Sequence, residues 1–268
     1  MTSANRLDAG RGHGAGPRRQ LPRSLPRYLA GTVVALQIGY PLLSGSARNA
    51  LTILTVVVFF AATVSHALLQ RGAAWTGGYV ALTAGVGLLA EAVGTATGIP
   101  FGSYDYAGSL GAQVLSVPVV IPLAWTMFAY PCLLVGQLLA KTALGAAMIG
   151  GAALASWDLF LDPQMVAAGH WSFDHVRLSL PGAPAVPLSN YLGWLVVAVL
   201  IVALLQLLGR RTADDRVPAT LFLWTYGSSV LANAVFFGRP GTAVVGGIGM
   251  GAIALPYARR LRTPVGSG

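Results

Sequence analysis

Residues 49–70 read NALTILTVVVFFAATVSHALLQ, a run of 22 residues that contains no Asp, Glu, Lys or Arg. A helix needs about 20 predominantly apolar residues to cross the hydrocarbon core of a bilayer, and this run reaches that length unaided. Similar runs follow one another through most of the chain, separated by shorter stretches rich in glycine, proline or charge. The sequence therefore predicts an all-α fold, a polytopic transmembrane helix bundle.

The chain of 268 residues divides into about eight such spans. The predicted spans are residues 28–45, 49–70, 75–97, 112–138, 142–162, 188–208, 217–238 and 241–257. They form a single membrane helical domain over residues 28–258, since no stretch is left for a separate soluble domain. Residues 1–27 are rich in Gly, Pro and Arg and are predicted to be a disordered basic cytoplasmic tail. Residues 259–268 are predicted to be a short cytoplasmic tail.

The charge pattern supports this division. Only 9% of the residues are charged, whereas soluble domains carry about a quarter. Of the 17 Lys and Arg residues, 14 fall on the side of the two termini, and three, Arg48, Arg177 and Arg239, fall on the other side. The positive-inside rule then places both termini in the cytoplasm, and we expect a multi-pass protein of the cell membrane. Because the cations stand at the ends of apolar runs, no nucleic-acid partner is expected.

Few ionisable residues lie inside the predicted spans, where each costs on the order of 2.5–3.5 kcal/mol on insertion scales. Glu91 lies about two turns from the outer end of the third span, and Asp158 lies one turn from the outer end of the fifth. Asp162 follows four residues later on the same helix face. Asn190 and Trp194 open the sixth span from the same side. Since the depths agree, we predict that the three carboxyl groups approach one cavity.

Two connections on the outer side are longer than ordinary turns. Residues 98–111 contain four glycines and no basic residue, which is typical of a re-entrant or lid-like segment. Residues 163–187 form the other long connection. The aromatic residues of the two connections include Phe101, Tyr104, Tyr106 and Trp171.

The stretch from Glu91 to Trp194 also carries a family pattern. Residues 97–106 read TGIPFGSYDY, which contains T-G-x-P-F-G-x-Y-x-Y. The other matching residues are Glu91, Leu110, Gly111, Val117, Pro118, Pro122, Trp125, Tyr130, Pro131, residues 158–163, Met165, Gly169, Trp171, Pro187, Asn190, Gly193 and Trp194. This pattern resembles the integral-membrane carotenoid biosynthesis proteins of the CruF and bisanhydrobacterioruberin hydratase type. Phe173 and Tyr191 replace other aromatic residues of that pattern, and Ala185 stands where glycine is usual.

The resemblance implies a hydro-lyase of the carotenoid 1,2-hydratase type. Such an enzyme adds water across the terminal C=C of a linear carotenoid, of the lycopene or γ-carotene type or of the C50 bisanhydrobacterioruberin type. Protonating an alkene needs a strong general acid and a controlled water but no redox cofactor, so no cofactor and no metal are expected. The implied partners are the carotenoid substrate, the lipid bilayer and other enzymes of the carotenoid pathway.

The residues expected to act in this reaction fall into two groups. The predicted catalytic residues are Glu91, Asp158 and Asp162, with Glu91 or Asp158 delivering the proton and the other carboxyl groups placing the water. The predicted substrate-binding residues are Tyr104, Tyr106, Phe101, Trp125, Tyr130, Trp171, Asn190 and Trp194. Aromatic faces among them would stabilise a tertiary carbocation by cation–π attraction, worth about 2 kcal/mol or more when desolvated.

Three alternatives use the same residues. Asp158 and Asp162 form a D-x-x-x-D pair, which in membrane prenyltransferases holds Mg²⁺ for a diphosphate substrate, although a second Asp-rich motif is missing. A membrane transporter would need a polar path to the inner face, where the sequence offers little beyond His66 and Gln137. A non-catalytic scaffold for other carotenoid enzymes would need only the fold, so loss of the carboxylates would leave it unaffected.

Overall fold

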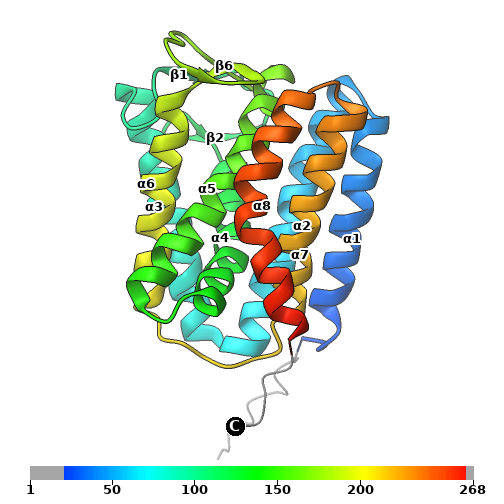
Figure 1. Cartoon of the computed structure of the whole chain (residues 1–268), viewed down its shortest axis with the longest axis vertical. Helices are drawn as coiled ribbons and strands as arrows, with labels where there is room; N and C mark the ends of the chain where they lie inside the picture. Colours follow the sequence, from blue (N-terminus) through cyan, green and yellow to red (C-terminus); the bar gives the residue numbers. More distant parts are fainter. Residues whose placement is uncertain (1–20, 264–268) are drawn as a thin grey trace, which may run out of the picture.

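The computed structural model describes residues 21–263, which form one bundle of eight α-helices (Figure 1). The helices are α1 (Leu25–Gly39), α2 (Gly45–Arg71), α3 (Ala73–Thr97), α4 (Val120–Leu139), α5 (Ala143–Ala167), α6 (Leu188–Gln206), α7 (Arg216–Leu231) and α8 (Pro240–Arg262). A 3₁₀ turn, η1 (Tyr40–Leu42), continues α1, and a π turn, η2 (Ala232–Phe236), continues α7. Seven helices, all but the 15-residue α1, are long and apolar enough to cross a membrane. The chain is a multi-pass helical membrane protein, as predicted.

Several predicted boundaries move. Residues 112–119, expected to begin the fourth span, form a small hairpin of β2 (Gln113–Val114) and β3 (Val117–Pro118) instead. Its two turn residues, Leu115 and Ser116, have positive φ angles, the geometry of tight hairpin turns, and α4 begins only after Pro118. Helix α1 stops at Gly39 rather than continuing to residue 45.

The ends of the predicted membrane domain also shift. Helix α5 passes through Pro163 and reaches Ala167, five residues beyond its predicted end. Helix α1 begins at Leu25, inside the predicted tail of residues 1–27, and α8 runs to Arg262, beyond residue 258. The rest of the predicted tails, residues 1–20 and 264–268, lies outside the described residues.

The two long connections meet at the end of the bundle opposite to the end where the described chain, residues 21–263, begins and ends (Figure 1). Strand β1 (Tyr104–Tyr106) pairs antiparallel with β4 (Trp171–Phe173), so that Tyr104 lies opposite Phe173 and Tyr106 lies opposite Trp171. A second ribbon, β5 (Ser179–Leu180) and β6 (Ala183–Pro187), precedes α6. We call residues 98–106 together with β4 the lid. The lid-like segment predicted at residues 98–111 thus acquires a partner strand from the other connection.

Helix ends and burial place the lid over the centre of the bundle. Helix α3 ends at Thr97, where Gly98 adopts a left-handed φ of 75° and Pro100 follows, both common features at the end of a helix. Among the seven helices able to cross a membrane, α4 is the most enclosed. In its 18-residue apolar stretch 72% of the residues are buried, against 22% in that of α3. The lid therefore starts on a lipid-facing helix and covers an inner one.

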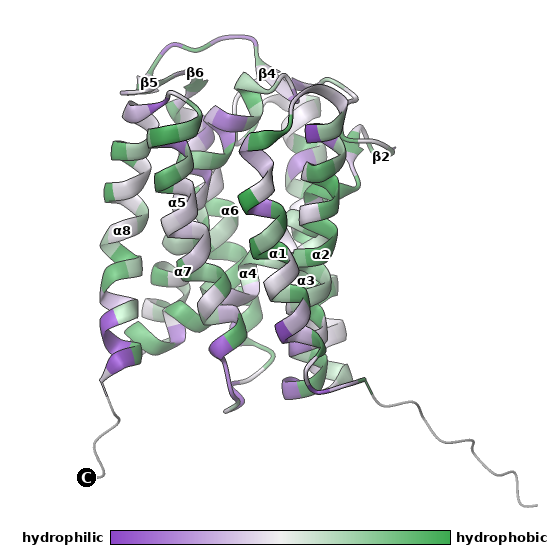
Figure 2. Ribbon diagram, turned by 90° about the vertical axis from the view of Figure 1, so that its right-hand side faces the viewer, coloured by the Kyte–Doolittle hydropathy of each residue, from purple (hydrophilic) through white to green (hydrophobic). Residues whose placement is uncertain are grey.

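Figure 2 shows hydrophilic residues gathered at the end of the bundle where the described chain begins and ends. Among residues 21–263, ten Lys and Arg residues belong to that end, and Arg48, Arg177 and Arg239 belong to the lid end. This asymmetry supports the prediction that both termini are cytoplasmic.

Cysteine labelling tests this orientation. We expect Asp105→Cys and Asp174→Cys, at exposed positions of the lid end, to react in intact cells with a membrane-impermeant maleimide. Lys141→Cys should react only after permeabilisation, because residue 141 lies in the connection between α4 and α5. The native Cys132 is buried and gives a low background. If position 141 alone were labelled in intact cells, the orientation in the membrane would be the reverse of the predicted one.

Candidate active site

A small cavity of about 30 Å³ lies beneath the lid, between α3, α4, α5 and α6. It is lined by Glu91, Phe101, Tyr104, Tyr106, Ile121, Ala124, Trp125, Leu161, Asp162, Trp171, Phe173, Asn190 and Trp194. A cavity needs only about 10–15 Å³ to hold one water molecule, so this space is sized for one or two waters. We call it the acid cavity, because two carboxyl groups face it.

Glu91 is held on one side of the acid cavity by three hydrogen-bond donors. Its Oε2 accepts from the Tyr106 hydroxyl at 2.8 Å and from the Tyr104 hydroxyl, and its Oε1 accepts from Trp125 Nε1 at 2.9 Å. An ionised carboxylate accepts at both oxygens and has no donor of its own, and hydrogen bonds to a charged group are the strong ones. This cradle of donors suits Glu91 as a carboxylate.

Two glycines on α3 make the cradle possible. Gly87 and Gly94 lie four residues before and three residues after Glu91, which places all three on one helix face. A Cβ at Gly87 would lie 2.9 Å from the Trp125 ring, and a Cβ at Gly94 would lie 2.7 Å from the Phe101 ring. The indole and the lid approach Glu91 closely because these positions carry no side chain.

Asp158 and Asp162 form a pair on α5, on the other side of the acid cavity. Both are buried, and Asn190 Nδ2 donates to Asp158 Oδ2 at 2.8 Å and to Asp162 Oδ2. The two carboxyl groups lie one helical turn apart on the same face of α5, and two buried carboxyl groups this close do not readily ionise together. The pair is therefore built to hold one proton. Asp162 faces the cavity, whereas Asp158 lies behind it.

Aromatic rings close the remaining sides of the acid cavity. Trp125 stacks on Trp194, with ring centroids 4.0 Å apart and planes 19° from parallel. From the lid, Tyr106 meets Trp171 edge to face at 5.7 Å. The lining of this space is largely aromatic and includes no basic side chain, an environment that tolerates a carbocation.

Tyr104 and Tyr106 of the lid and the adjacent His170 stay neutral. Burial and the neighbouring Glu91 raise the pKa values of Tyr104 and Tyr106, so both hydroxyls remain donors. Burial lowers the pKa of His170, whose Nδ1 lies 2.8 Å from Ser109 Oγ. The His170 carbonyl accepts from the backbone N–H of Ala107 at 2.9 Å, which ties the two halves of the lid region together.

Tyr130 is the one predicted substrate-binding residue that lies away from the acid cavity. It follows Trp125 by five residues on α4, which moves it about 7.5 Å along the helix and onto another face. Its hydroxyl accepts from Arg71 Nε at 3.1 Å and lies 3.1 Å from His66 Nδ1. Arg71 in turn pairs with Asp215. Tyr130 thus belongs to a polar cluster at the end of the bundle where the chain begins and ends.

The other predicted residues converge on the acid cavity, and the cavity adds four residues that the sequence did not indicate. These are Ile121, Ala124, Leu161 and Phe173. Three of the four are ordinary aliphatic residues inside spans, where nothing in the sequence separates a cavity-lining side chain from a lipid-facing one. Leu161 alone had a signal, since it lies between the two aspartates in the string DLFLD.

The geometry also bears on the magnesium alternative. Within residues 21–263, no group of three or more His, Cys, Asp or Glu side chains is arranged to hold a metal ion. The Asp158–Asp162 pair faces the amide of Asn190 rather than a basic group suited to a diphosphate. The pair thus has the surroundings of a proton donor.

Comparison with known proteins gives two matches. Residues 51–255 match the family described as "Carotenoid biosynthesis protein". The chain is also 37% identical over 123 residues to a bisanhydrobacterioruberin hydratase of Haloarcula japonica, which covers 41% of this chain and 39% of that protein. No solved structure matches the chain. Because the family match spans three quarters of the sequence and includes the whole acid cavity, the chain belongs to the carotenoid biosynthesis protein family.

Proposed function

We propose that this protein is a carotenoid hydratase that adds water across the terminal C=C of a linear carotenoid. One observation carries the proposal. Glu91 and Asp162 line the same small, aromatic-walled cavity, and the two carboxyl groups have different hydrogen-bond partners. Asp162 belongs to a proton-sharing pair, and Glu91 sits in a cradle of donors. The hydratase from Haloarcula japonica, a relative over part of the chain, supports the reaction class.

The first step uses the aspartate pair. Asp162 gives its proton to the CH carbon of the terminal CH=C(CH₃)₂ group, and the π electrons of the double bond form the new C–H bond. The positive charge then rests on the dimethyl-substituted carbon as a tertiary carbocation. Asn190 holds the resulting carboxylate through the hydrogen bond that its Nδ2 already donates to Asp162. The neighbouring indole faces of Trp125 and Trp194 offer the cation π density.

The second step uses Glu91. A water molecule in the acid cavity attacks the carbocation, and the Glu91 carboxylate takes the proton that the water loses. The product is a tertiary alcohol, heavier than the substrate by one water. The proton on Glu91 returns to the aspartate pair through a second water, which restores the site. Such positioned acid–base catalysis typically contributes about 10²–10⁴-fold to a rate.

The bilayer supplies the substrate. A long polyene dissolves in lipid, so only its end has to enter the bundle, and the acid cavity lies near the lid end, where water is close. The roles assigned here replace the sequence-based choice between Glu91 and Asp158 as the acid. The reason is that Glu91 is surrounded by donors alone, which match an ionised group.

The test is a defined reaction with purified protein. Lycopene incubated with the protein in detergent, without oxygen, nucleotide or flavin, should give a product heavier by one water. In water enriched in ¹⁸O the label should appear in that product, because the hydroxyl oxygen comes from solvent. An absolute need for oxygen or a reductant would replace hydration with oxidative hydroxylation. If the protein bound lycopene and released it unchanged, the result would favour a transporter or a scaffold.

A further inference from the structure

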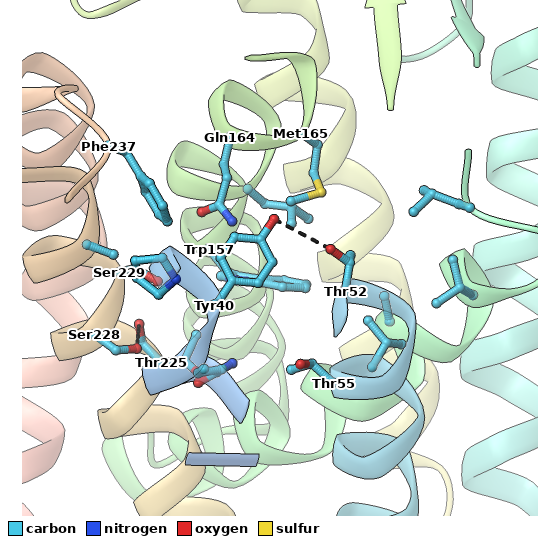
Figure 3. A pocket seen from close by; sticks show the side chains of 18 of the residues that line it. Tyr40, Thr52, Thr55, Trp157, Gln164, Met165, Thr225, Ser228, Ser229 and Phe237 are labelled. Carbon is cyan, nitrogen blue, oxygen red and sulfur yellow. Dashed lines mark hydrogen bonds between the residues drawn. The ribbon is translucent and has the colours of Figure 1, made fainter. Parts of the chain in front are cut away.

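A second, larger cavity of about 160 Å³ lies beside the acid cavity (Figure 3). Residues from α1, η1, α2, α4, α5, α7 and the lid line it, and Figure 3 shows Tyr40, Trp157, Gln164 and Ser229 around it. The two cavities share four wall residues, which are Ile121, Ala124, Leu161 and Trp171. Only these side chains therefore separate the larger space from Asp162.

The size and lining of the larger cavity fit a short branched hydrocarbon. An apolar cavity of about 150 Å³ is enough to hold benzene, so this one accommodates one or two five-carbon isoprenoid units and excludes a whole carotenoid. Its walls are mostly apolar, with Val56, Val120, Met165 and Phe237 among them. The acid cavity, at about 30 Å³, is too small for any isoprenoid unit. The larger cavity thus has the size for a hydrocarbon end group, and the acid cavity has the size for water.

Eight polar side chains line the larger cavity, and five of them, Gln37, Tyr40, Thr52, Thr225 and Ser228, form hydrogen bonds within the protein. The Thr52 hydroxyl bonds the Tyr40 hydroxyl at 3.5 Å, and the Ser228 hydroxyl bonds the Thr225 carbonyl at 3.4 Å. Thr55 Oγ1 is buried and has no hydrogen-bond partner among the described residues. The π turn η2 starts at Ala232, in the wall of this cavity, and π turns are frequent at functional sites.

We infer that the larger cavity is the chamber that binds the branched end of the linear carotenoid. The inference rests on the proposed function, and we call this space the end-group chamber. The terminal double bond reaches Asp162 past Ala124, the smallest of the four shared wall residues, while the rest of the polyene stays outside in lipid. Ala124 and Leu161 then determine how far the end group advances, and so which carbon receives the proton.

Ser229→Trp tests the chamber without touching the carboxyl groups. Ser229 lines the end-group chamber but not the acid cavity, so an indole there fills the space meant for hydrocarbon. Gly227→Trp is the matched control on the same helix, because a Cβ at Gly227 meets nothing within 4 Å. Binding is measured as lycopene retained by the purified protein in the Asp162→Asn background, so the readout does not depend on turnover.

We expect Ser229→Trp to weaken lycopene retention by at least about tenfold, since each excluded methylene is worth about fourfold in affinity. Gly227→Trp should retain lycopene as the parent does. Ala124→Leu, at the shared wall, should abolish hydration when Asp162 is intact, because the larger side chain keeps the double bond away from Asp162. Thr55→Val keeps the shape of the chamber and should bind lycopene equally well.

Each result has a distinct meaning. Undiminished retention by a folded Ser229→Trp variant would overturn the chamber, as would loss of retention in Thr55→Val, because a hydrocarbon needs no hydroxyl. If Ser229→Trp does not fold, Ala124→Leu provides the test instead, and full hydration by Ala124→Leu would overturn the inference. If wild-type protein hydrates nothing but Ser229→Trp still loses lycopene, the proposed function fails and the chamber stands.

Discussion

Asp162→Asn should lower the rate of hydration by about 10²–10⁴-fold, the usual effect of removing a positioned general acid. The amide has nearly the shape of the carboxyl group, and its oxygen still accepts from Asn190, so the fold should be kept. It carries no acidic proton for the alkene. The rate is measured in a single turnover with lycopene, with the hydrated product followed by mass.

Asp105→Asn is the control for this variant. Asp105 carries a carboxyl group on the lid strand β1, but its side chain is exposed and does not line the acid cavity. Its rate should equal that of the wild type. Full activity in Asp162→Asn would leave the buried pair as a structural feature and remove the proposed proton source.

Glu91→Gln should have the second-largest effect, a loss of about 100-fold, because the water then has no base to take its proton. The amide fits the site in one orientation. Its oxygen accepts from Trp125 Nε1, and its NH₂ group faces the hydroxyls of Tyr104 and Tyr106, which rotate to accept. The protein should therefore remain folded and retain lycopene while product formation falls.

Tyr106→Phe separates the charge of Glu91 from its orientation. It removes one of the three donors and leaves the carboxylate in place, so we expect a loss of only about tenfold, in line with one hydrogen bond to a charged group. Equal losses in Tyr106→Phe and Glu91→Gln would indicate that Glu91 merely anchors the lid. Wild-type activity in Glu91→Gln would exclude Glu91 as the base.

The sequence alone determined the membrane fold. Uninterrupted apolar runs and the distribution of Lys and Arg depend only on neighbours along the chain, so the spans could be counted before any contact was known. The depth of Glu91, Asp158 and Asp162 followed from the same count, because position along a helix converts directly into distance across the bilayer. The string TGIPFGSYDY likewise marked the lid before its partner strand was identified.

Tertiary structure decided which partners each carboxyl group has. The sequence treated Glu91 and Asp158 as equal candidates for the acid, since both are buried carboxyl groups at similar depth. The difference lies in partners that come from other elements. Glu91 meets donors from the lid and α4, whereas Asp162, one turn from Asp158 on its own helix, meets the amide of Asn190 on α6. Protonation depends on these through-space neighbours, which no local pattern encodes.

Tertiary structure also decided where the cavity proposed for the hydrocarbon lies. Tyr130 carried the same sequence signal as Trp125, yet the rotation of α4 between them moved it to a different cluster. The end-group chamber is built from side chains of five helices, among them Thr55, Ala124 and Ser229. In a membrane protein, apolar side chains that line a cavity and those that face lipid have the same composition, because both surroundings are apolar. Only the packing of the helices against one another separates the two.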